Sequence, residues 1–287
     1  MVAIDQRTRI AGYQTRTYKA LRMSEQVLDL FCLTGKVALV TGGARNLGRD
    51  MAEALAQAGA NVAITSRDLQ QAEQTAQAIA TATGRIVTAY ELDVTEETGI
   101  CSVIAAVIND FGQLDTLVNN AGNARNAAPL EERSLSDWQY TFETNSTATF
   151  LCTREAAKHM MARKEGVIIN IASISGMLGK DRRVYEGSDM IGVTIDYSSA
   201  KGAVINMTRD LACYLGPHGI RVNSISMSGF ERGQPADFLE RYKSQHPLGR
   251  IGKDGKDMKG AVVYLASEAS AWVTGHNLVL DGGFSAW

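Results

Sequence analysis

Cysteine, histidine and proline are scarce in this chain of 287 residues, with four of each. The cysteines are far apart and form no C-x-x-C pair, which argues against a disulfide framework or a zinc site and fits reduced thiols in a cytoplasm. The histidines are equally dispersed, and no H-E-x-x-H motif occurs. We therefore expect no metal site. The cysteines are Cys32, Cys101, Cys152 and Cys213, and the histidines are His159, His218, His246 and His276.

An excess of charge and a long apolar run are also missing. The formal net charge is −2, with no long basic block, so neither nucleic acid nor a membrane surface is an expected partner. No apolar run reaches the ~20 residues that a membrane-spanning helix needs. Hydrophobic residues make up 45 % and charged residues 21 %, as in ordinary soluble globular proteins.

The first 22 residues are basic and have a single acid, Asp5. Such a segment is either a transit peptide or a flexible extension before Met23, and we favour the extension. We assign residues 1–32 to this extension and residues 33–287 to one domain, because no Pro/Gly linker or repeat interrupts the latter. The basic residues are Arg7, Arg9, Arg16, Lys19 and Arg22.

From Lys36 onward, short apolar runs alternate with long amphipathic stretches, which predicts an α/β protein. The predicted strands are 36–40, 61–65, 85–91, 116–118, 166–171, 221–225 and 277–280. The predicted helices are 46–57, 69–81, 96–111, 138–163, 197–215 and 258–265. Repeated strand–helix–strand units predict a single doubly wound parallel sheet of the Rossmann-like kind, with helices on both faces.

A glycine-rich loop, Thr41-Gly-Gly-Ala-Arg-Asn-Leu-Gly48, joins the first predicted strand to the first helix. Glycines there allow the backbone to approach a pyrophosphate at the helix N-terminus. Asn46 stands where a central glycine is expected, and asparagine tolerates positive φ better than most residues. Polar residues also follow the third and fourth strands. The predicted cofactor contacts from these segments are Gly42, Arg45, Asn46, Leu47, Gly48, Asp93, Val94, Asn119, Ala121 and Gly122.

The charges near the second strand bear on which dinucleotide binds. An NAD site usually has an acid at this position for the ribose 2′-hydroxyl, whereas an NADP site needs cations. Here the strand runs into Ser66-Arg67, and Arg45 adds a second cation from the glycine loop. NADP(H) is therefore favoured over NAD(H). The alternative is that both arginines are solvated surface residues.

Tyr197 and Lys201 are four residues apart in a predicted helix, so their side chains share one face. A nearby ammonium favours the phenolate and lowers the pKa of the phenol, which suits it to proton transfer near neutral pH. A lone Y-x-x-x-K sequence also occurs by chance in many helices. Tyr185 cannot form such a pair, because Asp189 follows it at that spacing.

Together these segments resemble the short-chain dehydrogenase/reductase family from about Leu33 onward. The matching motifs are T-G-x-x-x-x-x-G at Thr41–Gly48, N-N-A-G at Asn119–Gly122, Asn145, Ser173, Y-x-x-x-K at Tyr197–Lys201, Ile220–Asn223, and Val273–Gly275 with Asp281–Gly283.

The resemblance implies a role for each member of the motif set. Tyr197 would be the general acid/base, and Lys201 would lower its pKa and bind the nicotinamide ribose. Ser173 would hydrogen-bond the substrate oxygen, with Ser175 as the rival serine. Asn145 would hold a water that links Lys201 to solvent, unless it only caps or bends its helix. Gly229 would also contact the cofactor.

The chain departs from the family pattern in two further places. Met227-Ser228 stands where the family commonly has Pro-Gly next to the nicotinamide. Ser173 and Tyr197 are 24 residues apart, which is longer than most members show. We expect the added segment, roughly 180–195, either to lie beside the substrate or to form a solvent or subunit contact.

The pattern is similar to the gluconate-5-dehydrogenase-like branch, which implies a polyol, sugar acid or keto sugar as substrate. We expect an NADP(H)-dependent oxidoreductase that interconverts a secondary alcohol and a ketone. The alternatives are a non-catalytic dinucleotide sensor or scaffold, supported by Met227-Ser228, and a C=N or C=C reductase. The resemblance also implies a homotetramer or homodimer that pairs the helices 138–163 and 197–215.

Overall fold

The computed structural model describes residues 26–188 and 190–287. The basic N-terminal segment, with Asp5 and Met23, lies outside the described residues, as does Asp189. In the part of the chain that is described, no helix is long and apolar enough to cross a membrane.

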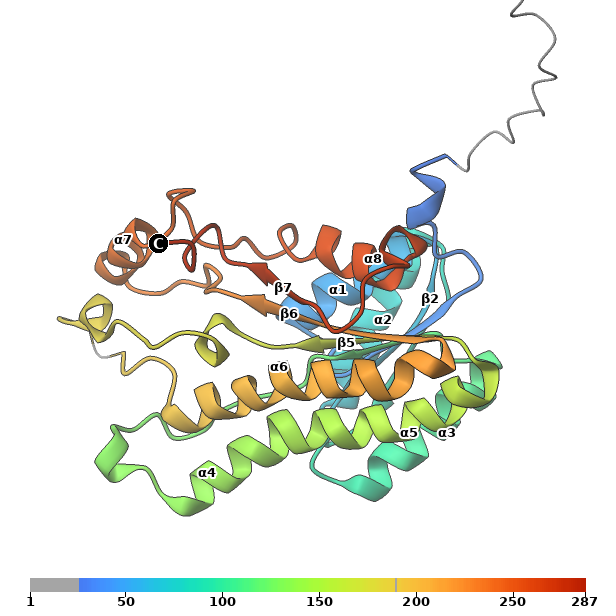
Figure 1. Cartoon of the computed structure of the whole chain (residues 1–287), viewed down its shortest axis with the longest axis horizontal. Helices are drawn as coiled ribbons and strands as arrows, with labels where there is room; N and C mark the ends of the chain where they lie inside the picture. The colour runs from blue at the N-terminus through green and yellow to red at the C-terminus, as the bar shows by residue number, and fades with distance from the viewer. Residues whose placement is uncertain (1–25, 189) are drawn as a thin grey trace, which may run out of the picture.

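Seven parallel strands form one sheet in the order β3-β2-β1-β4-β5-β6-β7 (Figure 1). The strands are β1 Val37–Val40, β2 Asn61–Ser66, β3 Val87–Glu91, β4 Thr116–Asn119, β5 Gly166–Ile171, β6 Ile220–Met227 and β7 Asn277–Leu280. Strands β1 and β4 are buried along their whole length, as expected for parallel strands covered on both faces. The predicted fold class is confirmed.

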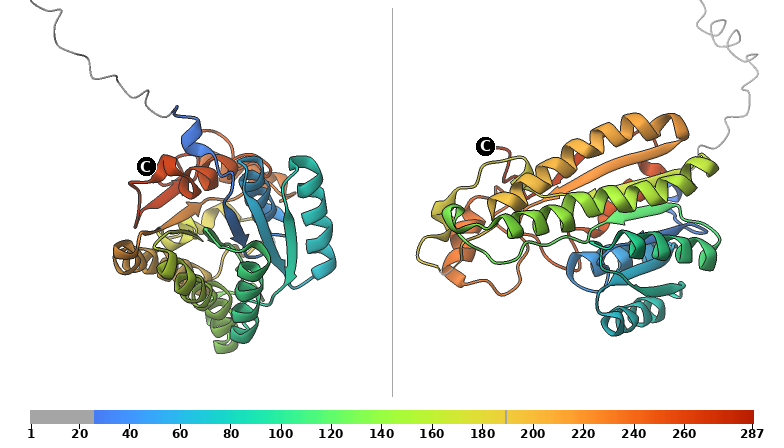
Figure 2. Two further views of the ribbon diagram at one scale, coloured as in Figure 1. Left: turned by 90° about the vertical axis from the view of Figure 1, so that its right-hand side faces the viewer. Right: turned by 90° about the horizontal axis from the view of Figure 1, so that it is seen from below.

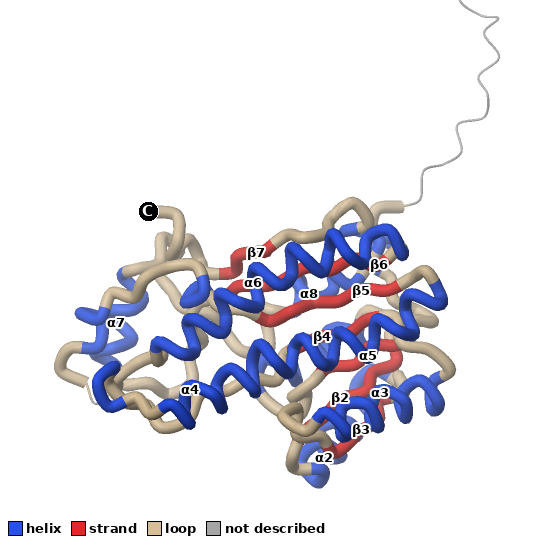
Figure 3. The backbone as a smooth tube through the Cα atoms, turned by 60° about the horizontal axis from the view of Figure 1, so that its bottom comes forward, coloured by secondary structure: helices blue, strands red, loops and turns tan. Residues whose placement is uncertain are grey.

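Helices cover both faces of this sheet (Figure 2). Apolar side chains of α1 (Asn46–Gln57), α2 (Leu69–Thr83) and α8 (Lys259–Ala266) pack in one buried cluster with the sheet. On the other face, α3 (Glu97–Phe111), α5 (Ala148–Arg163) and α6 (Ile195–Leu215) contribute to a second cluster, and Figure 3 shows α5 and α6 lying over the sheet and running alongside its strands.

The strand order fixes where a ligand can bind. From β1 the chain winds outward through β2 and β3, and it then returns to β4 and continues in the opposite direction. The loops that leave β1 and β4 therefore go to opposite faces of the sheet. Such a switch point opens a crevice at the carboxyl ends of the strands.

Two regions differ from the predicted elements. The helix predicted over 138–163 begins at α4 (Leu135–Phe142), because Ser134 caps its first turn by accepting from the Asp137 N–H. It then passes through a π-helical turn, Glu143–Thr147, before α5. A further helix, α7 (Ala236–Ser244), was not predicted. Only Phe238 in α7 is fully buried, so the segment lacks the long apolar stripe by which a helix is recognised.

Candidate active site

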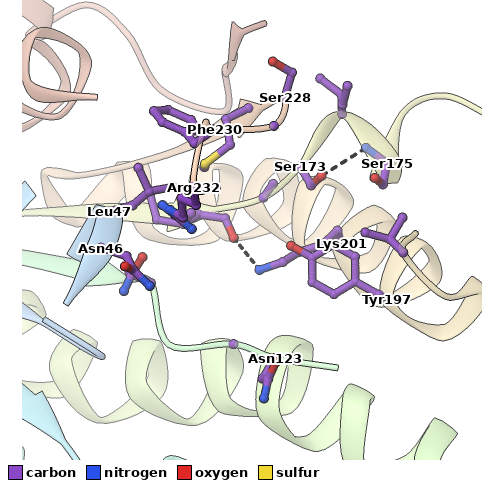
Figure 4. A pocket seen from close by; sticks show the side chains of 18 of the residues that line it. Asn46, Leu47, Asn123, Ser173, Ser175, Tyr197, Lys201, Ser228, Phe230 and Arg232 are labelled. Carbon is purple, nitrogen blue, oxygen red and sulfur yellow. Dashed lines mark hydrogen bonds between the residues drawn. The ribbon is translucent and has the colours of Figure 1, made fainter. Parts of the chain in front are cut away.

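A cleft of about 1000 Å³ opens at the carboxyl ends of the strands. One part of its wall is the glycine loop with the ends of β2 and β4. Another part holds Ser173, Tyr197 and Lys201, and the rest comes from the 180–193 segment and the region around α7. Figure 4 shows Asn46 and Leu47 of the glycine loop in the same cavity as Tyr197 and Lys201.

The glycine loop is held close to the sheet by contacts that its own backbone makes. Asn46 has φ 50°, so it adopts the left-handed conformation that its position requires. A Cβ at Gly48 would collide with the Gly42 carbonyl, so a side chain there would open the turn. Asn120 ties the loop to β4, because its Nδ2 donates to the carbonyls of Thr41 (2.8 Å) and Gly42 (3.1 Å).

Two arginines line the cleft next to this loop. Arg45 and Arg67 are both exposed, and within the described residues neither guanidinium forms an ion pair or a hydrogen bond. The acid nearest in sequence, Asp68, instead caps α2, since its Oδ1 accepts from the Gln71 N–H at 3.0 Å. This corner of the cleft is therefore positively charged, with its neighbouring carboxylate engaged elsewhere.

Ser173, Tyr197 and Lys201 come together at the ends of β5 and α6 (Figure 4). The Lys201 ammonium donates to the Ile171 carbonyl at 2.8 Å and lies 5.5 Å from the centre of the Tyr197 ring. Ser173 and Ser175 both line the cleft, and the Ser173 Oγ accepts from the Ser175 N–H at 3.1 Å. Ser173, and not Ser175, is near enough to the Tyr197 phenol to lower its pKa.

Burial governs the protonation of this pair. It raises the pKa of Tyr197 to about 12, although the contact with Ser173 acts in the opposite direction. It also lowers the pKa of Lys201 to about 8. The sequence predicted a lowered pKa for Tyr197, whereas burial raises it. Desolvation of the phenol outweighs its attraction to the Lys201 ammonium, which is hydrogen-bonded to the Ile171 carbonyl.

Asn145 lies inside the π-helical turn and is fully buried. Its Nδ2 donates to the carbonyls of Asn123 (2.7 Å) and Thr141 (2.8 Å), while its Oδ1 meets no donor among the described residues. A Cβ at Gly122 would collide with this Oδ1 and would lie 3.4 Å from the Lys201 Nζ. The unpaired oxygen is thus aimed at the narrow space between Gly122 and Lys201.

Asn119 is the exception among the predicted cofactor residues, because it does not line the cleft. Its Nδ2 donates to Thr153 Oγ1 (3.0 Å) and Asn170 Oδ1 (2.9 Å) in the protein interior. Successive strand residues point to opposite faces, so Asn119 turns inward and Asn120 reaches the cleft instead. The other predicted cofactor contacts line the wall: Gly42, Arg45, Asn46, Leu47, Gly48, Ser66, Arg67, Asp93, Val94, Ala121, Gly122 and Gly229.

Comparison with known proteins agrees with this geometry. A family model described as enoyl-(acyl carrier protein) reductase matches residues 42–285. The chain is 35 % identical over 263 residues to a gluconate 5-dehydrogenase of Gluconobacter oxydans, covering 90 % of this chain and 97 % of that protein. The chain belongs to the short-chain dehydrogenase/reductase family.

Other relatives of this short-chain dehydrogenase/reductase are similar over comparable lengths. An NADP-dependent mannitol dehydrogenase of Hypocrea jecorina is 33 % identical over 270 residues, covering 91 % of this chain and 97 % of that protein. The crystal structure of a gluconate 5-dehydrogenase from Burkholderia cenocepacia, in complex with NADP and tartrate, has a TM-score of 0.82 and 32 % identity. That match covers 91 % of this chain and 99 % of the other. The chain is therefore an oxidoreductase of a family that acts on alcohols and ketones.

The Met227-Ser228-Gly229 turn, where this family member departs from Pro-Gly, is fixed by other contacts. Ser228 N donates to the Leu280 carbonyl (3.2 Å), and Gly229 N donates to the Tyr242 hydroxyl (3.1 Å). The Ser228 Oγ is 3.0 Å from the Nε2 of buried His246, whose Nδ1 is 2.8 Å from the Tyr242 carbonyl. A carbonyl only accepts, so Nδ1 carries the proton and Nε2 accepts from Ser228.

Sequence reasoning missed His246 and Tyr242 as supports of this turn. Together with Phe238 they recur every four residues along α7 and just beyond it, and that spacing was the available signal. Phe238 and Tyr242 stack with ring centroids 5.3 Å apart, and Tyr242 and His246 meet edge to face at 5.0 Å.

The long segment between Ser173 and Tyr197 lies along the cleft. Lys180, Tyr185 and the backbone near Gly192 form part of its wall. Arg241 of α7 holds the segment by donating to the carbonyls of Val184 (3.1 Å) and Glu186 (2.7 Å). The segment therefore lies beside the cleft.

A buried ion pair anchors the first turn of α6. Arg133 Nη2 and Asp196 Oδ2 are 2.6 Å apart, and their side chains are 3 % and 0 % exposed. Arg133 also donates to the carbonyls of Arg125 (2.7 Å) and Asn126, which ties the 123–134 loop to the helix. Burial of Asp196 opposes ionisation, but the hydrogen bonds that its carboxylate accepts from Arg133 lower its pKa to about 2.

Proposed function

We propose that the protein is an NADP(H)-dependent oxidoreductase that interconverts a secondary alcohol and a ketone. One observation carries this proposal: Ser173, Tyr197 and Lys201 converge in a cleft whose other end is a glycine loop flanked by two arginines. The crowding at Gly48 and the left-handed Asn46 suit close approach of a pyrophosphate to the backbone. Such a site would hold the dinucleotide through Gly42–Gly48, with Arg45 and Arg67 at its 2′-phosphate.

The proposed mechanism couples proton transfer to hydride transfer. A bound nicotinamide supplies or accepts the hydride. During ketone reduction, negative charge develops on the substrate oxygen, and the hydroxyls of Ser173 and Tyr197 are the donors that stabilise it. Tyr197 then gives its proton to that oxygen, and in the oxidation direction it takes the proton back.

Lys201 and Asn145 would restore the proton on Tyr197. The Lys201 ammonium, held at the Ile171 carbonyl, stabilises a tyrosinate beside it. The unpaired Asn145 Oδ1 near Lys201 supports a role in binding a water that links the lysine to solvent. A residue that served only to bend its helix would not need to direct a buried acceptor toward this space.

We also propose that the substrate is a polyol, sugar acid or keto sugar. The polar 180–193 segment along the cleft supports this class, as do the gluconate and mannitol dehydrogenases among the relatives. For assembly we propose a homotetramer or homodimer through α5 and α6, where Phe150 is 45 % exposed.

A substrate panel tests the reaction class directly. Purified protein with NADPH is mixed with keto sugars, keto acids, an aliphatic ketone, an enone and an imine, and nicotinamide absorbance is followed. We expect loss of NADPH with the polar ketones and an alcohol as product. Turnover of only the enone or imine would favour the C=C or C=N alternative. Tight NADPH binding without turnover of any compound would favour a non-catalytic sensor.

Substitution of Arg67 tests the cofactor preference. Arg67→Asp removes one charge-assisted contact to the 2′-phosphate and adds a repelling carboxylate, so kcat/KM for NADPH should fall about 10- to 100-fold. The value for NADH should stay the same or rise. Arg49→Asp is the matched control, because Arg49 is an exposed arginine of α1 that does not line the cleft. An unchanged NADPH-to-NADH ratio in Arg67→Asp would refute the assignment.

A further inference from the structure

One end of the cleft has an aromatic wall that the proposed chemistry does not use. Tyr185, Phe238, Tyr242 and Phe284 all line the cleft. Tyr185 and Phe238 have ring centroids 5.1 Å apart, and Tyr242 and Phe284 are 5.6 Å apart. These rings come from the long segment before α6, from α7 and from the C-terminus, which lie near one another in Figure 1.

Lys180 is the cation at this wall. Its Nζ lies 4.3 Å from the centre of the Tyr185 ring, where the negative face of the ring attracts it. Gly192 closes the other side with φ 76°, and a Cβ there would lie 2.6 Å from the Lys180 Nζ and 2.7 Å from Tyr185 Cζ. The ammonium is therefore held in place between a ring and bare backbone, on the surface of the cleft.

The charge of Lys180 is not neutralised by the described residues around it. Asp181, its neighbour in sequence, is engaged by Arg183, whose backbone N, Nε and Nη2 donate to its carboxylate at 2.9–3.0 Å. Burial, with a smaller effect from the positive charge of Arg182, lowers the pKa of Lys180 to about 8. A partly desolvated cation without a carboxylate gains more from an incoming anion than a solvated one does.

We propose that Lys180 binds the carboxylate of a hydroxylated substrate at the end of the cleft lined by Tyr185 and Phe238. This inference rests on the proposed function and specifies its substrate class: sugar acids and their keto forms, rather than neutral ketoses. A carboxylate carries one charge and matches a single lysine, whereas a phosphate dianion calls for more donors. Ser173 and Lys180 line the same cleft, and the proposal has one substrate contact both.

Kinetics with matched substrates test the assignment. Lys180→Gln keeps most of the stem but removes the charge, and the probes are 5-keto-D-gluconate and the neutral ketose D-fructose. We expect kcat/KM for the keto acid to fall about 10- to 100-fold, mainly through KM, while the value for fructose changes less than about threefold. Lys180→Arg should retain most of the preference. Lys256→Gln removes an equal charge from an exposed side chain outside the cleft wall, leaves the Arg183–Asp181 contact intact, and should change neither value. Equal losses on both substrates in Lys180→Gln would overturn the inference.

A binding measurement separates this subsite from the proposed reaction. Calorimetry with gluconate and the NADP⁺-saturated protein needs no turnover, and gluconate should bind about 10- to 100-fold more weakly to Lys180→Gln. An unchanged Kd for gluconate would overturn the subsite even if the enzyme reduces ketones. A larger loss for glucose 6-phosphate than for gluconate would overturn the choice of carboxylate. If wild type reduces no ketone but gluconate binding depends on Lys180, the reaction fails and the subsite stands. NADPH affinity of each variant serves as the folding control.

Discussion

Tyr197→Phe should lower kcat for ketone reduction by about 100- to 10,000-fold, because it removes the proposed proton donor and leaves the ring in place. The loss should appear in both kcat and kcat/KM, since the missing interaction strengthens as charge develops on the substrate oxygen. NADPH affinity should change little. Steady-state kinetics and fluorescence titration of NADPH measure the two effects separately.

Two control variants sharpen this test. Tyr214→Phe removes a hydroxyl from the same helix at a side chain that is 68 % exposed, and it should keep wild-type activity. Ser175→Ala should retain far more activity than Ser173→Ala, because Ser173 is the serine whose hydroxyl lowers the pKa of Tyr197. Full activity in Tyr197→Phe would remove the central residue of the proposed mechanism.

Asp196→Asn should destabilise the protein by about 3–5 kcal/mol, because it removes the close counter-charge of the buried Arg133 guanidinium and leaves only the Asp137 carboxylate, 3.9 Å away. Both side chains are nearly inaccessible to solvent, so water cannot replace the lost partner. Urea unfolding followed by circular dichroism should show a lower midpoint. Activity should fall as well, because Tyr197 lies in the helical turn that this ion pair anchors.

The pH dependence of wild type provides an independent check of the pair. The pKa of Asp196 is about 2 in the folded protein, below the ~3.9 of an unfolded aspartate. Its contribution to stability is therefore complete above pH ~4 and is lost as the pH falls toward ~2. Asp196→Asn should lack this contribution to acid sensitivity.

A surface pair and a double variant complete the comparison. Glu240→Gln breaks the exposed contact with Lys243 and should cost less than about 1 kcal/mol. Arg133→Met combined with Asp196→Leu should be more stable than Asp196→Asn, because it leaves no unpaired buried charge. Equal urea midpoints for Asp196→Asn and Glu240→Gln would show that the buried pair does not anchor α6.

Local patterns predicted most of the sheet and helices. β5 and β7 begin and end at the predicted residues, as does α1, because each strand is a short apolar run and each helix has a regular apolar face. Helix α7 and the π turn around Asn145 were not predicted. Both depend on contacts with distant segments, such as the hydrogen bond from Asn145 Nδ2 to the Asn123 carbonyl.

The candidate site also combines features that the sequence predicted with features that it did not predict. The glycine loop and the Tyr197–Lys201 spacing are short-range features, so the sequence alone identified them. The sequence did not predict that the Asn119 side chain turns inward, because its orientation follows from the pleat of β4 and from its partners Thr153 and Asn170. The direction of the Tyr197 pKa shift was also wrong, since burial is a property of the folded chain.

The sequence by itself determined the family, the parallel α/β sheet and the set of side chains available for proton transfer. Those features depend on residue type and on spacings of a few positions. Only the tertiary structure decided what stands around them: the His246 support of the Ser228 turn, the Arg133–Asp196 anchor, and the position of Lys180 on the cleft wall. Each of these joins segments that are far apart in the chain, and desolvation and contact geometry at such junctions exist only after the chain has folded.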